Sequence, residues 1–527
     1  MSIDSPTNVD ELACSLQEPL LTRGCVDEGQ QDSNTDTTTT INDGNPIIYD
    51  NEGRADGQET RRLYDGLHLK DSLLIKFLYF LDALGSSAWG RFSAIYYNNH
   101  GLNTQQIGLI EGLRTFTPTI SMVFWGFIAD RFQCRKQVWI WTKSGATSIL
   151  LMLALPWVTK SFFRILWVSV GAQLFVSNGA ILDSYTLELL GTENKDLYGR
   201  YRLYASLSWG FGSIVMGWIT DNYGFDWNFI MFGALSILMI VLVAYFIPDT
   251  INNEADQDPL AADNRATGEI NIENESLNDA VDEDDQIGDI SDLLFLITKP
   301  RVLFFFVEVI VMGAAMATVE RLLFLYMIND LHSSTLLCGM SVGVNVLCEL
   351  PIFWYASSIL NFLGSDGMFL LSMTCFVVRV YGYTLLTPST KHWILALELM
   401  HGVTFATFWI VTTDVSKVLI DKSRGGFWST TIPSIVQMSY NAVGATIGSV
   451  FGGFAMHRYG SRQMYLFIAV SVLCMLFVHL VGSILVRTCR PELGSVLPGC
   501  RCPTSNGNNE EEENEQGHEQ DGDEVGD

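Results

Sequence analysis

The chain has 527 residues, 48% of them hydrophobic, and a formal net charge of −27. The negative charge is concentrated in residues 1–71, 249–292 and 503–527, whose formal charges are −10, −14 and −10, so the strongly apolar remainder carries +7. Acidic polar segments argue against nucleic-acid binding. We find no phosphate-binding glycine loop, zinc-type His/Cys cluster or nucleophile motif, so we expect neither an enzyme nor a cofactor or metal site.

Residues 1–71 begin the chain, and their composition predicts a disordered cytoplasmic segment. They are rich in Asn, Asp, Thr and Gly, and such sequences bury too little apolar surface to offset the entropy lost on folding. The same reasoning predicts disorder in an acidic loop at 249–299 and in a tail at 487–527. These segments are either solvated chains or binding sites for cytoplasmic partners. Three tail cysteines are either lipidated or free thiols: Cys489, Cys500 and Cys502.

Between these segments lie apolar stretches long enough to cross a bilayer, which takes about 20 helical residues. They form an N-terminal group within 72–248 and a C-terminal group within 300–486. The sequence therefore predicts an all-α membrane protein with twelve transmembrane helices in two six-helix bundles. The predicted helices cover 72–97, 104–129, 137–156, 162–188, 200–221, 227–247, 300–328, 336–358, 366–386, 393–416, 427–455 and 462–486.

The distribution of Lys and Arg predicts the orientation in the membrane. Twelve crossings leave both termini on one side. If that side is the cytoplasm, the inner loops carry 17 basic residues and the outer loops five. We therefore expect a multi-pass integral membrane protein with both termini and the acidic loop in the cytoplasm. The sequence does not distinguish the plasma membrane from an internal membrane.

The two groups of predicted helices share a sequence pattern. The stretches GSIVMGWITDNYG (212–224) and GSVFGGFAMHRYG (448–460) share three glycines, a serine and a tyrosine at a constant offset of 236 residues. Asp183 recurs as Asp414 at the similar offset of 231. Such matches indicate a duplication. Parallel repeats of this kind place a substrate cavity between the halves, near the membrane midplane.

The loop after the second predicted helix reads GFIADRFQCRK (126–136). It resembles the cytoplasmic signature of the major facilitator superfamily, in which a loop of this kind latches one conformation. Gln133 stands where the family has its second glycine. We expect the first glycine to allow close helix approach, the aspartate to cap or pair near a helix end, and the basic residues to keep the loop cytoplasmic. The matching residues are Gly126, Asp130, Arg131, Arg135 and Lys136.

Two further stretches narrow the resemblance. YGRYRLYAS (198–206) and ELMHGVTFATFW (398–409) are similar to segments of the subgroup that contains the lactose permease and the "major facilitator superfamily domain-containing protein 6"-like proteins. The likeness covers roughly 72–247 and 300–486. It implies the major facilitator fold and alternating access, while the substrate remains open because one fold serves many functions.

Ionisable residues within the first group of helices point to a functional site. A charged group at the bilayer centre costs about 2.5–3.5 kcal/mol on insertion scales, so it normally faces a cavity and has a partner. Helical rise places Asp82 and Arg114 at a similar depth in neighbouring helices, which predicts an ion pair between them, and Glu111 could share Arg114. The alternative is a static pair that only fixes helix packing.

The second group contains a larger set of such residues. Arg379, Glu398 and His401 are predicted to share the outer half of the membrane, with Glu349 deeper and next to Pro351. The lactose permease subgroup has a similar set, with the acid and the histidine in the opposite order. We hypothesise that Glu398 carries a proton, that His401 and Arg379 tune it, and that Glu349 binds substrate or a second proton. The alternative is a hydrogen-bonded packing cluster.

Charged residues near the inner helix ends suggest gates. Asp183 could pair with Arg200 or Arg202, and Asp414 with Lys417 three residues later, as inner gates or as simple helix-end salt bridges.

The pattern as a whole predicts a secondary active transporter that moves a small organic solute by alternating access, with protons as the coupling partner. An uncoupled facilitator or antiporter of the same fold is one alternative. A receptor or scaffold that keeps the fold, with the acidic segments as its working part, is another.

Overall fold

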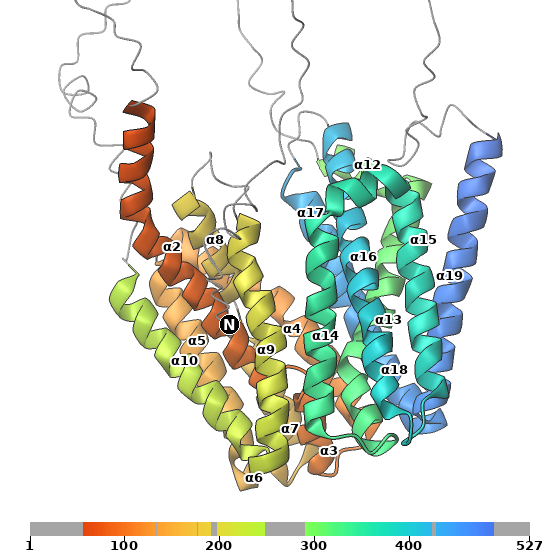
Figure 1. The fold of residues 1–527 in the computed structure, drawn as a ribbon, viewed down its shortest axis with the longest axis horizontal. Helices are drawn as coiled ribbons and strands as arrows, with labels where there is room; N and C mark the ends of the chain where they lie inside the picture. Colours follow the sequence, from red (N-terminus) through yellow and green to blue (C-terminus); the bar gives the residue numbers. More distant parts are fainter. Residues whose placement is uncertain are drawn as a thin grey trace, which may run out of the picture. The chain divides into compact units, whose positions relative to one another are not determined.

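The computed structural model divides into two units, Met1–Asp65 and Gly66–Asp527, and apart from the start of the first helix every described helix lies in the second unit. Within the described ranges the chain forms helices and connecting turns, with no β-strand (Figure 1). The structure describes residues 56–132, 134–176, 178–190, 198–247, 290–423 and 428–489.

The described helices fall into a first half, α2–α10, and a second half, α12–α19 (Figure 1). The first half comprises α2 (Asp56–Trp89), α3 (Ser93–Asn99), α4 (Thr104–Arg131), α5 (Arg135–Leu151), the 3-10 turn η1 (Met152–Ala154), α6 (Pro156–Thr159), α7 (Phe162–Gln173), α8 (Asn178–Leu190), α9 (Tyr198–Tyr223) and α10 (Asp226–Phe246). The second half comprises α12 (Ile290–Thr298), α13 (Pro300–Asn329), α14 (Thr335–Trp354), α15 (Ala356–Leu385), the 3-10 turn η5 (Lys391–Trp393), α16 (Ile394–Lys422), α17 (Thr431–Met438), the π-helix η7 (Ser439–Gly444), α18 (Ala445–Tyr459) and α19 (Ser461–Cys489).

Six helices among the described residues are long and apolar enough to cross a membrane by length and composition. They are α10, α13, α14, α15, α16 with the turn before it, and α19. Each of the twelve predicted ranges contains helix, but the count of twelve crossings remains a prediction. Exposed Leu, Phe, Trp and Ile side chains are numerous, as expected where lipid replaces water around a helix bundle.

Several predicted helices are interrupted. The range 72–97 breaks at 90–92, the range 137–156 after Leu151, the range 162–188 at 174–176 and the range 336–358 at Tyr355, and the range 427–455 contains the π-helix η7. The break at 174–176 lies just before Asn178 and Gly179, two residues of low helix propensity that begin α8. Another turn lies inside α15 at Gly364, where φ is 68°, a conformation that glycine adopts without steric cost.

Parts of the predicted disordered segments are helical. Residues 56–71 belong to α2, and α12 lies inside the predicted loop 249–299. In α2, acidic residues near the helix start are followed by leucines at helical spacing. In α12 the apolar run LLFLI buries Leu293 and Leu296. The remaining acidic segments, Cys500, Cys502 and the side chain of Cys489 lie outside the described residues.

Two pairs of helices make the most extensive contacts between the halves, α9 with α14 and α4 with α18. Glycines permit both contacts. A Cβ atom on Gly339 would lie 2.1 Å from the carbonyl oxygen of Ser213, and one on Gly108 would lie 2.4 Å from that of Ser449. Ser213 and Ser449 occupy the same position of the sequence repeat, so the two interfaces are built in the same way. We call them the α9–α14 and the α4–α18 interface.

The α9–α14 interface has an additional polar contact at one end. Asp221 accepts hydrogen bonds from the backbone N–H of Thr335 (2.8 Å), its hydroxyl group (2.5 Å) and the backbone N–H of Leu336 (2.8 Å). A carboxylate at a helix N-terminus satisfies free N–H groups and interacts favourably with the helix dipole. At the repeat position equivalent to Asp221 the chain has His457, and the hydroxyl group of Thr104, at the start of α4, has no hydrogen-bond partner among the described residues.

We expect Gly108→Ala to destabilise the protein, because the atoms in the way of a new Cβ are backbone atoms of α18, which cannot move aside singly. Overpacking of this kind costs about 1–3 kcal/mol. The measurement is the thermal unfolding of the purified protein in detergent. The control is Gly126→Ala in the same helix, where a Cβ meets nothing within 4 Å. Equal melting temperatures for the two variants would contradict the close approach of α4 and α18.

Candidate functional site

A cavity of about 470 Å³ lies between the two halves. Both halves contribute side chains to its wall, and these include charged, amide and aromatic groups. The first-half residues are Ala83, Gly90, Arg91, Ala205, Ser206 and Trp209. The second-half residues are Glu320, Arg321, Val342, Asn345, Val346, Glu349, His401, Phe405, Trp409, Tyr440 and Asn441.

Breaks in regular helix position several of these groups. Arg91 lies in the turn between α2 and α3, beside Gly90, where a Cβ atom would lie 2.4 Å from the indole ring of Trp209. Tyr440 and Asn441 belong to the π-helix η7. π turns are rare in proteins as a whole, but those that occur inside α-helices are often found at functional sites. The extra residue redirects the neighbouring side chains.

One wall of the cavity is aromatic. His401 stacks on Phe405 at 5.9 Å between ring centroids with an interplanar angle of 9°. The series continues through Trp409, 6.0 Å from Phe405, to Tyr440, 5.2 Å from Trp409. These rings come from α16 and η7 and face Trp209 of the first half across the cavity lining.

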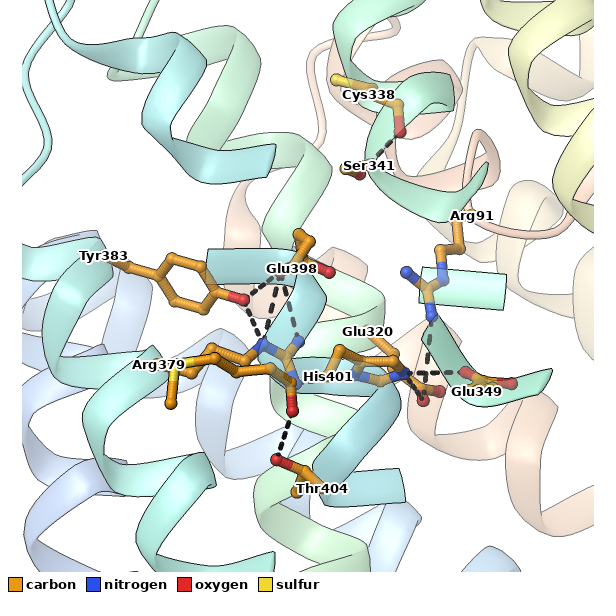
Figure 2. A network of polar contacts seen from close by, with 11 residues as sticks. Arg91, Glu320, Cys338, Ser341, Glu349, Arg379, Tyr383, Glu398, His401 and Thr404 are labelled. Carbon is orange, nitrogen blue, oxygen red and sulfur yellow. Dashed lines mark hydrogen bonds and ion pairs between the residues drawn. The ribbon is translucent and has the colours of Figure 1, made fainter. Parts of the chain in front are cut away.

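Behind this wall lies a cluster of four polar side chains with little or no exposure (Figure 2). The Arg379 guanidinium lies 3.3 Å from Glu398 Oε1 and 2.6 Å from His401 Nδ1. Its Nε donates to the Tyr383 hydroxyl at 2.5 Å, and that hydroxyl donates to Glu398. Arg379 and Glu398 are both 0% exposed. The predicted proximity of Arg379, Glu398 and His401 is therefore observed, and Tyr383 is an additional member.

His401 connects this cluster to the cavity (Figure 2). Its Nε2 lies 3.8 Å from Glu349 and 3.9 Å from Glu320. Glu320 in turn lies 3.8 Å from Arg91 of the first half. These distances exceed the usual 2.7–3.2 Å of a hydrogen bond, so the charged groups around the cavity attract one another without direct hydrogen bonds between them.

The first half has a tighter cluster next to the cavity. Arg114 donates to Glu111 at 2.6 Å and to the Ser93 hydroxyl at 2.9 Å, and Ser93 donates to Glu111 at 2.7 Å. The other oxygen of Glu111 lies 3.6 Å from Arg321 of α13. Glu111 contacts Arg114, as predicted, but does not share it with Asp82. The contact of Glu111 with Arg321 links the cluster to the second half.

The predicted ion pair between Asp82 and Arg114 is wrong. Asp82 accepts a hydrogen bond from Lys143 of α5 at 2.6 Å. Helical rise fixes the depth of a residue but not the direction of its side chain, and Glu111, three residues before Arg114 on the same helix, binds the guanidinium instead. Lys143 lies in a predicted transmembrane helix, and a charged residue in that apolar stretch is the sequence feature that indicates a partner for Asp82.

In the described part of the chain neither predicted gate forms a direct ion pair, although Arg202 interacts electrostatically with Asp183. Asp183 accepts a hydrogen bond from the Tyr79 hydroxyl at 2.6 Å, and Arg202 lies over the ring of Tyr198. Asp414 accepts from the Ser365 hydroxyl at 2.6 Å. Both carboxylates therefore contact neutral hydroxyl groups of neighbouring helices. The predicted basic partners lie farther away: Arg200, Arg202 and Lys417.

The signature loop agrees with prediction in part. Asp130, near the end of α4, pairs with Arg135 at 3.3 Å across the turn. Gly126 does not mediate a close helix contact, since a Cβ on it would meet nothing within 4 Å. Arg131 is exposed and Lys136 is half-buried, while Gln133 lies outside the described residues.

Another buried contact between a histidine and a glutamate lies away from the cavity lining. His479 of α19 contacts Glu308 of α13 at 2.5 Å, and both side chains are buried. This pair joins two helices of the second half. Among the described residues no group of His, Cys, Asp or Glu has the arrangement of a metal site.

The site therefore contains ionisable groups in near-continuous contact, from Arg114 and Glu111 in the first half to Arg379 and Glu398 in the second. A proton that binds or leaves at one of them changes the electrostatic energy of its neighbours. Sequence reasoning missed Arg91, Asn345, Tyr383 and Tyr440, because helix periodicity does not reveal which side chains face a cavity.

Comparisons with known proteins agree with this architecture. Residues 73–467 match the model of the MFS_1 like family. Major facilitator superfamily domain-containing protein 6-like protein B of Xenopus laevis is 21% identical over 188 residues, covering 36% of this chain and 29% of the relative. The sucrose permease of Escherichia coli is 25% identical over 174 residues, covering 30% and 40%. The matched region thus spans less than half the length of these curated relatives.

Solved structures show a similar fold. The nucleoside transporter NupG superposes with a TM-score of 0.60 at 15% identity, covering 78% of this chain and 98% of that chain. A POT family transporter superposes with a TM-score of 0.56 at 13% identity, covering 79% and 96%. At these identities the likeness concerns the fold alone.

We expect Lys143→Met to lower stability by about 1–3 kcal/mol, because it leaves the Asp82 carboxylate without its partner in a mostly apolar environment. The double variant Asp82→Asn/Lys143→Met should recover part of that loss. A double-mutant cycle of thermal stabilities measures the coupling. If the stability losses of the two single variants were simply additive, the Asp82–Lys143 pair would make no contribution to stability. The matched control is the same cycle with Asp82→Asn and Arg114→Met.

Proposed function

This chain belongs to the MFS_1 like family and is a multi-pass membrane transporter of the major facilitator type, and we propose that it moves a small organic solute by proton-coupled symport. The solute occupies the cavity between the halves, and alternating access exposes the cavity to either side of the membrane. Both termini and the acidic segments lie in the cytoplasm, where the excess of basic loop residues supports their placement.

One observation carries the proposal of proton coupling. Glu398 is fully buried, contacts Arg379 and Tyr383, and connects through His401 to Glu349 and Glu320 at the cavity. Its second oxygen, Oε2, is buried and has no hydrogen-bond partner among the described residues. A helix movement that separates this carboxyl from the guanidinium would remove its favourable charge interaction.

The coupling follows from the shared position of His401. Solute that contacts Glu349 or Glu320 changes the electrostatic field at the imidazole, and the imidazole contacts Arg379 directly. Movement of Arg379 away from Glu398 then lets Glu398 bind a proton, and return of Arg379 releases it. In this mechanism Glu398 is the proton carrier, His401 and Arg379 tune it, and Glu349 faces the solute.

The inward and outward states differ in which ends of the halves are in contact. The α9–α14 and α4–α18 interfaces separate or close as one half rocks against the other, and the signature loop with its Asp130–Arg135 pair stabilises one state. Glycine contacts suit this role because they bring backbones together without interlocking side chains.

We expect ligand binding by the wild-type protein to be tighter at pH 5.5 than at pH 7.5, and Glu398→Gln to remove this difference. Symport requires that the protonated protein bind solute better, and glutamine mimics the neutral carboxyl. The measurement is a thermal-shift screen of the purified protein with a metabolite library at both pH values. A ligand at about 100 times its Kd stabilises the folded state by about 2.7 kcal/mol.

The matched control is Glu308→Gln, which also removes a buried carboxylate that contacts a histidine but does not line the cavity. The control should retain the pH dependence of binding. A ligand shift that is equal at both pH values in the wild type would contradict coupling and favour a facilitator. In proteoliposomes, Glu398→Gln should abolish accumulation driven by a pH gradient while exchange of labelled for unlabelled solute continues.

A further inference from the structure

Asn345 of α14 has unused hydrogen-bonding capacity at the cavity. It lines the cavity and is 2% exposed, and neither its amide nitrogen nor its amide oxygen has a hydrogen-bond partner in the described part of the chain. Buried amide groups are nearly always paired, so an exception needs an explanation. A residue that offers a donor and an acceptor side by side is suited to a ligand that presents the complementary pair.

The helix around Asn345 holds it in place. Val346, the next residue, lies against Gly210 of α9, where a Cβ would come within 3.1 Å of it, and Ile214 of α9 fills the space beside Gly343. Asn345 thus lies on a part of α14 that is packed closely against the first half. Because α14 cannot rotate freely there, the backbone that carries Asn345 is held in position beside the cavity.

The aromatic wall suits a flat ligand. Phe405, Trp409 and Tyr440 line the cavity from the second half, and Trp209 lines it from the first. Trp409 also has a buried indole N–H without a partner among the described residues. Planar rings stack on such side chains, and every heteroaromatic base has a face that can do so.

The charges around the cavity favour a solute without net charge. Two arginines, Arg91 and Arg321, are balanced by Glu320 and Glu349. Each arginine has an anionic neighbour within the protein: Glu320 lies 3.8 Å from Arg91, and Glu111 lies 3.6 Å from Arg321. A strongly anionic ligand would repel the two glutamates, and a strongly cationic ligand would repel the two arginines.

We propose that the cavity binds a neutral, planar heterocycle of the nucleobase type, with the Asn345 amide making two hydrogen bonds to a ring edge that carries an adjacent donor and acceptor. The inference rests on the proposed function in assuming that this cavity is the transport site. An asparagine amide matches such an edge in a two-point contact, as it does with adenine. Phe405 and Trp409 supply the stacking surface. The polar end near Arg91 and Glu320 accommodates attached hydroxyl groups, so nucleosides fit the same class.

The test uses adenine, adenosine and uridine as probes. Purine, which lacks the exocyclic amino group of adenine, is the matched analogue, and sucrose and tryptophan represent other solute classes. Affinities of the purified protein are measured by titration calorimetry. We expect at least one nucleobase-type probe to bind the wild type, purine to bind about tenfold or more weakly than adenine, and Asn345→Ala to weaken the preferred probe by a similar factor, as the loss of one or two hydrogen bonds does.

Two variants complete the design. Asn345→Asp keeps an acceptor but loses the donor, so it should discriminate against probes that need the donor. The control Asn228→Ala removes another buried asparagine, one that accepts a hydrogen bond from Thr220 in the first half and does not line the cavity. It should leave affinities unchanged. If Asn345→Ala fails to fold, the comparison of adenine with purine on the wild type decides the matter.

The outcomes separate this inference from the proposed function. Preference for sucrose or tryptophan, equal binding of adenine and purine, binding of no probe, or unchanged affinity in Asn345→Ala would each overturn the assignment of the heterocycle. Another ligand with pH-dependent binding that Glu398→Gln abolishes would leave proton coupling intact. Conversely, adenosine binding that depends on Asn345 but not on pH would support the ligand class and contradict the coupling.

Discussion

The fully buried guanidinium of Arg379 is the constraint on which the site depends. A charged group in an apolar interior is stable only with partners close enough to replace water. Glu398, Tyr383 and His401 supply them. Because these residues come from α15 and α16, the guanidinium also determines how two long helices pack. Any event that changes its partners therefore changes both local charge and helix position.

The tight ion pairs of the first half differ from the charged groups that line the cavity. In the first half, Arg114 with Glu111 and Lys143 with Asp82 are hydrogen-bonded at 2.6 Å. Around the cavity, by contrast, the charged atoms are 3.6–3.9 Å apart. Tight pairs stabilise one arrangement, whereas looser pairs leave donors and acceptors free for a solute. This contrast places the structural and the responsive charges in different parts of the molecule.

The sequence predicts some of this organisation and not the rest. Charged residues in apolar stretches, together with helical rise, place Arg379, Glu398 and His401 at one level, and the structure brings them together. The same reasoning mispaired Asp82, because depth does not specify the direction of a side chain and Glu111 lies one turn from Arg114. Arg91 was missed because it lies in a turn that the sequence presents as continuous helix. The unpaired amide of Asn345 depends on packing between halves that are far apart in the chain.

The α9–α14 and α4–α18 interfaces have glycines and a serine at equivalent positions of the sequence repeat, but they differ at the position of Asp221, where the other repeat has His457. Asp221 holds the start of α14 with three hydrogen bonds, whereas α4 receives a single hydrogen bond from α18, between the Thr446 hydroxyl and the Gly112 carbonyl at 3.2 Å. Separating the two halves therefore breaks more hydrogen bonds at the α9–α14 interface than at the α4–α18 interface. We therefore expect the α4–α18 interface to open more readily than the α9–α14 interface. A single difference between equivalent positions, Asp221 in one half and His457 in the other, thus makes two otherwise similar interfaces unequal in the number of contacts that hold them.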